Sequence, residues 1–437
     1  MTSRRQFLLR TAAAGVAVPA AARATLAASP SRTLPADAPP QPPGRPFVDY
    51  TPVETPNGAS LPWKVVDGRK VFHLIAEPVR HTFAPGLQAN CFGYNGRVHG
   101  PTIEAVEGDT VRIYVTNKLD QPTTVHWHGL IVPCGMDGVG GLTQRSIEPG
   151  ETFLYEFVLR QHGTFMYHSH HDEMTQMAMG LMGMFVVHPR RPDEPRPDRD
   201  FVYMLSEWPI VVGTERPNPT EMTDFNVLTF NATVFPATAP MVVKKGQRVR
   251  IRIGNLSAMD HHPIHLHGHA FTVIGTDGGT IPPPARWSET AVLVAVGQTR
   301  TMEFFADNPG DWAMHCHMTH HVMTQMGHGV PNLVGVDPSL FDEKLAALDP
   351  TFAAMGSDTG GEASGADTED DTLPKNSLPM VGGAGPFGYI TMGGMVTVLK
   401  VRENLNDYAD PGPYAHPAGT VADVASADNL AKDGIDG

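Results

Sequence analysis

Two stretches of this chain repeat one another, and this repeat constrains the fold more than any other feature. Residues 108–117 match residues 246–255, which lie 138 positions later, through a shared Gly, a Val-Arg-Ile run and an Asn. His126-Trp-His-Gly129 matches His265-Leu-His-Gly268 at a shift of 139. Five further identities occur at a shift of 147: Gly150, Glu156, Phe157, Gly163 and His168 match Gly297, Glu303, Phe304, Gly310 and His315. Because the shift changes only between matched segments, the sequence predicts two copies of one domain with loops of different length.

Short alternating runs bounded by turn residues indicate that each copy is built from β-strands. Residues 111–115 and 153–157 place apolar side chains at alternate positions, which is typical of half-buried strands. Gly and Pro account for 44 and 40 of the 437 residues, and this content favours many turns. We therefore predict an all-β protein with two β-sandwich domains that arose by internal duplication.

Composition marks where these domains begin and end. A Pro-rich segment precedes the first block, a charged connector around residues 190–200 joins the blocks, and residues 356–371 hold six acids and no base. Residues 388–402 are typical of one terminal strand. The predicted organisation is an extended lead-in at 29–62, a first domain at 63–190, a second domain at 200–345, a disordered acidic linker at 356–375, a C-terminal strand segment at 376–404 and a loose tail at 405–437.

The first residues are typical of an export signal. Ser3-Arg-Arg-Gln-Phe-Leu8 precedes a small-residue apolar stretch, and Ala22-Arg-Ala24 is similar to a cleavage site, so residues 1–28 resemble a twin-arginine signal peptide. This signal predicts a periplasmic or secreted protein. Such a compartment permits a disulfide between Cys91 and Cys134, and two unpaired buried thiols are the alternative.

Charge and hydropathy argue against two classes of partner. The chain has 46 acids against 32 bases and a net charge of −14, so it lacks the basic footprint of a nucleic-acid binder. It has no run of 18 or more apolar residues, and we therefore expect no membrane span.

Paired histidines indicate a metal site. Among 21 His in 437 residues, about one His-x-His pair would arise by chance, and five occur. Four of them stand at equivalent places in the two repeats: His126/His128, His168/His170, His265/His267 and His315/His317. Residues two apart on a strand point the same way, so each domain is predicted to present four imidazoles on one face. Eight imidazoles are too many for one zinc ion and suit a polynuclear centre between domains.

A second kind of site is predicted on the opposite face of the second domain. Cys316 lies between His315 and His317, and alternation turns its thiolate away from both. His262 is three residues before His265, so it also points to that face. His321 and Met326 follow Cys316 at +5 and +10. Two His, a Cys and a weak axial Met are the ligands of a blue-copper centre.

These motifs resemble those of the multicopper oxidases, in particular the two-domain laccase-like members with mononuclear copper in the second domain. The resemblance covers roughly residues 88–336 and the closing strand. It implies cupredoxin-like Greek-key sandwiches, four copper ions, and one-electron oxidation of donors coupled to reduction of O₂ to water. By motif, it implies type 1 copper at His262, Cys316, His321 and Met326, type 2 copper at His126 and His265, and the type 3 pair at His128, His168, His170, His267, His315 and His317.

The first domain is predicted to lack a blue-copper site. The repeat places Thr123, Ser169 and Met174 where the second domain has His262, Cys316 and His321. Without a thiolate and imidazoles the position cannot hold a blue copper. This also disfavours a copper nitrite reductase, which has a similar layout but carries its blue copper in the first domain.

Other residues near the motifs admit two interpretations. Asp137 matches a family acid near type 2 copper, where it would deliver protons as a catalytic residue alongside Cys316; the alternative is a turn residue before Gly138. Val322 stands where family members often carry an acid. The many methionines near the motifs would either pack the core or bind Cu(I).

The function predicted from the resemblance is a laccase-like oxidase that takes phenolic or similar donors and O₂. Electrons would enter at type 1 copper and cross Cys316 to His315 and His317. The alternatives are a cuprous or manganous ion oxidase in copper tolerance, and a non-catalytic copper-binding or electron-transfer protein. The small laccase-like proteins that the chain resembles are homotrimers with clusters shared between subunits, and we expect the same assembly here.

Overall fold

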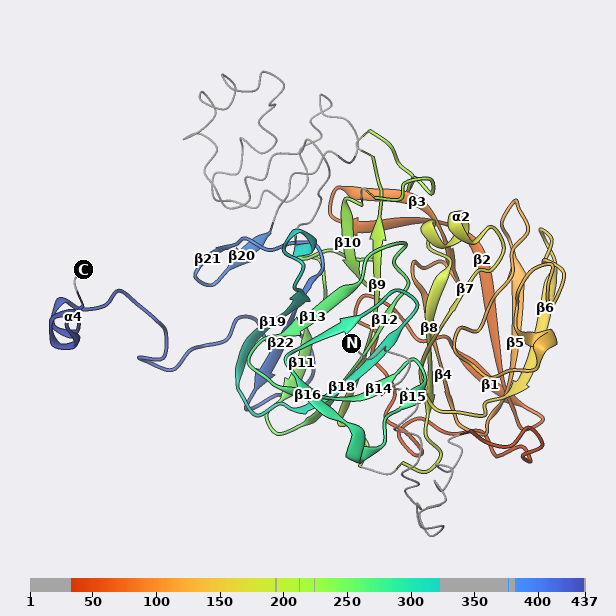
Figure 1. Ribbon diagram of the computed structural model, residues 1–437, viewed down its shortest axis with the longest axis horizontal. Helices are drawn as coiled ribbons and strands as arrows, with labels where there is room; N and C mark the ends of the chain where they lie inside the picture. Colours follow the sequence, from red (N-terminus) through yellow and green to blue (C-terminus); the bar gives the residue numbers. More distant parts are fainter. Residues whose placement is uncertain are drawn as a thin grey trace, which may run out of the picture. The chain divides into compact units, whose positions relative to one another are not determined.

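The computed structural model describes residues 33–192, 195–211, 213–223, 225–322, 376 and 382–435 of the chain (Figure 1). The predicted signal peptide at 1–28, the acidic linker at 356–375, and Met323 and Met326 lie outside these residues. Within them, no helix is both long and apolar enough to cross a membrane.

The first sequence repeat forms two sheets. One has five strands in the order β1-β2-β5-β6, with β3 paired to the outer part of β2; the other has the order β4-β8-β7. The bounds of the first sheet are β1 Trp63–Val66, β2 Arg69–Ala84, β3 Leu87–Tyr94, β5 Thr110–Asn117 and β6 Thr152–Val158. Those of the second are β4 Gly100–Val106, β7 Gly163–His168 and β8 Met182–His188. The short helices η2 (Cys134–Met136) and α2 (Glu173–Ala178) lie in the connections.

The second repeat also forms two sheets, ordered β10-β9-β12-β18-β14-β15 with β16 on β14, and β11-β22-β19-β13-β17. Although β22 comes from the C-terminal end of the chain, it lies between β11 and β19 (Figure 1). The larger sheet contains β9 Arg199–Trp208, β10 Val227–Phe230, β12 Arg248–Asn255, β14 Phe271–Thr276, β15 Gly279–Thr280, β16 Trp287–Glu289 and β18 Thr299–Phe305. The other contains β11 Met241–Lys244, β13 His262–Leu266, β17 Ala291–Val294, β19 Gly310–Cys316 and β22 Val396–Arg402. The short helices are η3 (Pro283–Ala285) and η4 (Thr319–Val322).

The alternation read from the sequence produces the two cores. Val111, Ile113 and Val115 of β5 are fully buried, and so are their repeat partners Val249, Ile251 and Ile253 of β12. Each set belongs to its own cluster of buried apolar side chains. Since apolar burial is the main favourable term in folding, each repeat has its own stabilising core. The prediction of an all-β fold with two β-sandwich domains is confirmed.

Several buried contacts join the repeats. A buried cluster rich in methionine combines Met166, Met182 and Met184 of the first repeat with Met204 and Leu256 of the second. The lead-in contributes as well, because the backbone N–H of Val53 donates to Glu104 while Glu54 pairs with Arg199 on β9. For these methionines, packing is therefore the correct interpretation.

The C-terminal segment differs from the prediction of one strand over 388–402. A small hairpin, β20 Gly383–Gly385 with β21 Gly388–Ile390, comes first, and β22 starts only at Val396. The strand is interrupted because Gly394 adopts a positive φ of 57°, which is incompatible with a continuous ladder.

The prediction of a loose tail is wrong for its first part. Lys400 pairs with Asp410, the backbone N–H of Tyr414 donates to Asp311, and Arg199 lies 3.6 Å from the centre of the Tyr408 ring. These contacts could not be predicted from the sequence, because the tail residues bind side chains on strands that are distant in the sequence. The end of the chain is exposed and contains the helix α4 at Ala427–Asp433.

Both cysteines considered for a disulfide are free in the structure. Cys91 is buried on β3, whereas Cys134 is exposed at the start of η2. The disulfide interpretation is therefore wrong, and the alternative of buried thiols holds for Cys91 alone.

A buried ion pair where the second repeat contacts the first gives a stability prediction. Arg252 on β12 donates two hydrogen bonds to Asp200 on β9, at 2.8 and 2.9 Å, and a third to Thr164 of the first repeat. We expect Asp200→Asn to lower the free energy of unfolding by about 3 kcal/mol, because it leaves a buried guanidinium without its counter-charge. Urea unfolding measures the change, and Asp49→Asn in the exposed Arg45–Asp49 pair is the control. Equal stability losses in the two variants would contradict the prediction.

Candidate copper centres

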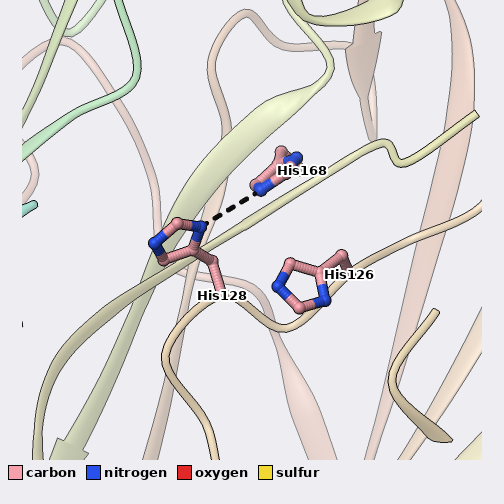
Figure 2. Close-up of side chains that lie close together, drawn as sticks. All are labelled: His126, His128 and His168. Carbon is pink, nitrogen blue, oxygen red and sulfur yellow. Dashed lines mark hydrogen bonds between the residues drawn. The ribbon is translucent and has the colours of Figure 1, made fainter. Parts of the chain in front are cut away.

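In the first repeat, four histidines converge where two chain segments meet. His126 and His168 form a bridge in which the N–H of each donates to the carbonyl of the other, at 2.8 and 3.2 Å. The centres of the His126 ring and of the His128, His168 and His170 rings lie 5.4–5.8 Å apart. Figure 2 shows His126, His128 and His168 directed toward a common space. Ligand nitrogens of these three lie within 4.8 Å of one another, which is close enough to share metal ions. We call these four residues the first quartet.

Hydrogen bonds fix the ring orientations in the first quartet. The Nδ1–H of His126 donates to the carbonyl of Asp137 at 2.8 Å, and that of His168 donates to the carbonyl of Ser169 at 2.8 Å. Both rings thereby keep Nε2 as a lone-pair donor. The Nε2–H of His128 donates to the carbonyl of Gly297 at 2.9 Å, so its Nδ1 faces Nε2 of His168 at 3.3 Å. The arrangement orients nitrogen lone pairs into the shared space, as a metal site requires.

The second repeat builds an equivalent group, the second quartet of His265, His267, His315 and His317. His265 on β13 is the register partner of His315 on β19, and the ring centres lie 4.7–5.7 Å apart along the group. The same orientation device recurs: Nδ1–H of His315 donates to the carbonyl of Cys316 at 2.8 Å, and Nδ1–H of His265 donates to that of Thr290 at 2.6 Å. The duplication has thus preserved the outer hydrogen bonds as well as the imidazoles.

The two quartets remain separate within one chain. Among the described residues, the ring contacts of each quartet involve only its own members. His267 and His317 are exposed, and about a third of the His170 side chain is also exposed. Each quartet is therefore partly exposed to solvent in the single chain.

Behind the second quartet lies a buried group of two histidines and a cysteine. Cys316 Sγ lies 3.7 Å from Nδ1 of His262 and 3.5 Å from Nδ1 of His321, and the two nitrogens lie 3.1 Å apart. All three residues are buried, and their donor atoms fall within 4.8 Å of one another. As predicted from odd spacing, Cys316 and His262 face away from the quartet. Met326, the predicted axial ligand, lies outside the described residues.

Burial prepares these side chains for a metal cation. It lowers the pKa of His262 and of His168 to about 3, since a buried imidazolium loses its hydration. The rings therefore stay neutral with a free lone pair at physiological pH. Burial also raises the pKa of Cys316 to about 12, so the thiolate needs a cation beside it. Two neutral imidazoles and a thiolate fit copper, which prefers soft sulfur and nitrogen donors.

Asp137 lies beside the first quartet. One of its carboxylate oxygens is 3.5 Å from Nδ1 of His126, and its carbonyl accepts the hydrogen bond described above. Its φ and ψ of −75° and −21° place it at the end of η2, so it also serves as a turn residue. The two interpretations of Asp137 are therefore compatible.

The first domain differs from the predicted equivalence at one position. Thr123 and Ser169 are buried together, with their hydroxyl oxygens 3.3 Å apart, as expected from the repeat. Met174, however, is 63% exposed on α2. Gln176, one half-turn later, is fully buried and accepts from both hydroxyls. The equivalence with His321 failed because Gln176 follows Ser169 by seven residues whereas His321 follows Cys316 by five, so a fixed shift does not hold there.

Two acids beside His321 were missed by sequence reasoning. The Asp260 carboxylate lies 3.5 Å from Nε2 of His321. The Glu207 carboxylate contacts the backbone of the loop that carries Asp260. Glu207 accepts from the N–H groups of Met259 and Asp260 at 2.6 and 3.3 Å. Burial, followed by the charge of Asp260, raises its pKa to about 8. Glu207 comes from β9, 55 residues before His262, and Asp260 precedes a motif read only for its histidines. No spacing signal marked either acid.

Comparisons with known proteins agree with this geometry. Two models of the multicopper oxidase family match residues 76–192 and 212–335. The multicopper oxidase mgLAC, of known structure, is 33% identical with a TM-score of 0.54, over 63% of this chain and 94% of that one. Copper resistance protein A of Escherichia coli is 31% identical over 43% of this chain and 39% of that protein. Laccase-18 of Oryza sativa subsp. japonica is 30% identical over 49% of this chain and 38% of that protein.

The chain belongs to the multicopper oxidase family, and its two sandwiches have the cupredoxin-like fold. The cofactor of this family is copper, which agrees with the donor chemistry of the histidines and Cys316. The matched region spans about two-fifths of the length of the two curated relatives.

We expect Cys316→Ser to abolish the blue absorption of the copper-loaded protein while the fold survives, because a hydroxyl cannot replace the thiolate donor. Visible absorption measures the effect, and circular dichroism checks the fold. Ser169→Ala, at the equivalent position of the first repeat, is the matched variant and should leave the blue band at full intensity. An intensely blue Cys316→Ser protein would show that the blue site lies elsewhere.

Proposed function

We propose that this protein is a laccase-like oxidase, which oxidises phenolic or similar one-electron donors and reduces O₂ to water. The observation that carries the proposal is the His315-Cys316-His317 segment. It places one side chain in the buried Cys-His group and its two neighbours in an open quartet. Bound copper supplies one-electron chemistry at the first of these places and oxygen reduction at the second. A simple electron carrier does not need the open histidine quartet.

The copper count and types are part of this proposal. His262, Cys316, His321 and Met326 would hold type 1 copper, and His126 and His265 would hold type 2 copper. The type 3 pair would be held by His128, His168, His170, His267, His315 and His317. The Nδ1–H bonds of His126, His168, His265 and His315 to carbonyls support these roles, because they leave Nε2 free. Asp137, beside His126, would hold a proton near the oxygen site.

Asp260 would receive the donor. Its carboxylate is 37% exposed and lies beside His321 Nε2, the edge of the Cys-His group that faces away from Cys316. A carboxylate there accepts a hydrogen bond from a phenolic hydroxyl, which orients the ring against His321. Glu207 holds this loop in place through the two N–H groups that it accepts.

Oxidation of Cu(I) or Mn(II) in copper tolerance is the second candidate. Met259 directly precedes Asp260, and Met318 directly follows His317. They are 53% and 40% exposed, and exposed thioethers bind Cu(I). The similarity to copper resistance protein A agrees with this alternative. A non-catalytic copper-binding protein is the candidate from another class.

Oxygen uptake distinguishes these functions. We expect catalytic O₂ consumption with a phenol and with Cu(I), and a higher kcat/KM for the phenol. Asp260→Asn should lower kcat/KM for the phenol about tenfold, since one charged hydrogen bond is lost, and should leave the blue band in place. Cys316→Ser is the inactive control. A preference for Cu(I) or Mn(II) would establish the metal-ion oxidase, and binding of copper without O₂ uptake would contradict both enzymes.

We further propose a homotrimer in which the first quartet of one chain meets the second quartet of its neighbour. The open and separate quartets support this arrangement, since a head-to-tail ring lets every half-site find a partner. The short connector around residues 190–200 also limits how far one domain can turn onto the other. Export by the twin-arginine route to the periplasm or outside the cell, read from residues 1–28, remains part of the proposal.

Complementation tests the shared cluster. A His168→Ala/His170→Ala chain and a His315→Ala/His317→Ala chain should each be inactive, and dissociation followed by mixed reassembly should restore oxygen reduction. Activity returns because some interfaces then join two intact quartets. Reassembly of each variant alone is the control. If the cluster lies within one chain, every mixture stays inactive, and a monomer with full copper content would end the trimer proposal.

A further inference from the structure

A buried polar group in the first domain occupies the place of the Cys-His group of the second. It consists of Thr123, Ser169 and Gln176, which we call the Gln176 triad, and all three side chains are fully buried. The Gln176 carbonyl oxygen accepts from the Ser169 hydroxyl at 2.5 Å and from the Thr123 hydroxyl at 2.7 Å. Its amide nitrogen donates to the carbonyl of Pro122 at 2.8 Å. Both lone pairs of the amide oxygen are therefore used, and its orientation is fixed.

The triad ties together the two segments that carry the first quartet. Thr123 lies three residues before His126, and Ser169 lies between His168 and His170. A flanking bond reinforces the link, because the N–H of His170 donates to the Thr124 hydroxyl at 3.1 Å. The two backbone hydrogen bonds between His126 and His168 join the same two segments. The triad thus forms the buried part of the hydrogen-bond network that sets the spacing between the histidines.

The second domain has a different connection at the same place. There His262 and Cys316, the repeat partners of Thr123 and Ser169, approach through Nδ1 and Sγ at 3.7 Å, and His321 completes the group. A metal ion bound to these atoms would tie the β13 and β19 ends to η4. In the first domain the Gln176 amide from α2 ties the equivalent segments without an ion.

We propose that Gln176 is a positioning residue for copper, an uncharged replacement for the blue-copper ion that holds the first quartet in its metal-binding geometry. The inference rests on the proposed copper-binding function. Side chains that orient metal ligands from outside change metal affinity by 10–100-fold when mutated. Gln176 acts on the ligands through its hydrogen bonds with Ser169 and Thr123, and so belongs to this class.

Removal of the amide has a defined physical consequence. Gln176→Leu removes the shared acceptor of the Thr123 and Ser169 hydroxyls and the donor to the Pro122 carbonyl. The hydroxyls then keep only longer bonds, to each other at 3.3 Å, from Ser169 to the His171 carbonyl at 3.2 Å and from Thr123 to the Thr124 carbonyl at 3.4 Å. Poorly paired buried polar groups are costly, so the two segments are expected to move apart until better partners or water reach them. His126 and His168 then lose their spacing. The second domain, with its own core, is not affected.

The test compares copper at the two places in one sample. The full chain is loaded with copper, and a chelator is titrated while two signals are followed: the blue absorption of the Cys-His group, and the electron paramagnetic resonance signal of copper held by nitrogen ligands alone. Gln176→Leu should need 10–100-fold less chelator to lose the second signal, with the blue band unchanged. Thr123→Val, which removes one hydroxyl and keeps the shape, should give a smaller change in the same direction.

Thr229→Val is the matched control. Thr229 is fully buried in a similar group on the second domain, where its hydroxyl bonds Ser206 and Trp208. It should lower the melting temperature about as much as Gln176→Leu but leave both copper signals at their wild-type chelator concentrations.

Each outcome decides the inference. Wild-type copper retention in Gln176→Leu would overturn it, and so would equal loss of both signals or loss of the second signal in Thr229→Val. If Gln176→Leu does not fold, Thr123→Val decides by the same readings. A wild-type protein without a blue band would instead show that the proposed function has failed.

Discussion

Adjacent side chains at the end of a β-strand point in opposite directions, and the sites of this protein depend on that geometry at His315, Cys316 and His317. The last residues of β19 turn the thiol into the buried Cys-His group while the flanking imidazoles join the open quartet. Neither site can move without the other. The sheet register fixes the rest, because His265 pairs with His315 across β13 and β19. Two chemically different groups are thus held together by a few backbone hydrogen bonds.

Comparison of the repeats shows which part of this arrangement tolerates change. The imidazole pairs and their Nδ1–H bonds to carbonyls are present in both copies, at His168 and at His315. The group behind them has diverged completely, from a thiol with two imidazoles to two hydroxyls with an amide. Both versions join the same pair of segments and both are buried. The requirement at this place is therefore a connection among three side chains, which different chemistries can satisfy.

Much of this could be predicted from the sequence, because it depends on short periods. Alternation gave β5 and β12, and odd or even spacing placed Cys316 and His262 opposite the quartets. Contacts between distant segments could not be predicted. Gln176 takes the place expected for Met174 because it follows Ser169 by seven residues whereas His321 follows Cys316 by five, and Glu207 reaches Asp260 from another strand. Likewise, the attachment of Tyr414 to Asp311 needs the folded sheet. A linear pattern contains no information on these partners.

The two connections also differ in charge. Burial keeps the imidazoles of the Cys-His group neutral and disfavours the Cys316 thiolate, so the thiolate forms at little cost only with a cation beside it. The Gln176 triad carries no charge, and its dipoles are already paired. In the second domain the charged thiolate therefore forms only with an ion beside it, whereas the first domain holds no charge at this place. In the first domain, the hydrogen bonds of the Gln176 triad thus connect the two segments that carry the quartet without any ion.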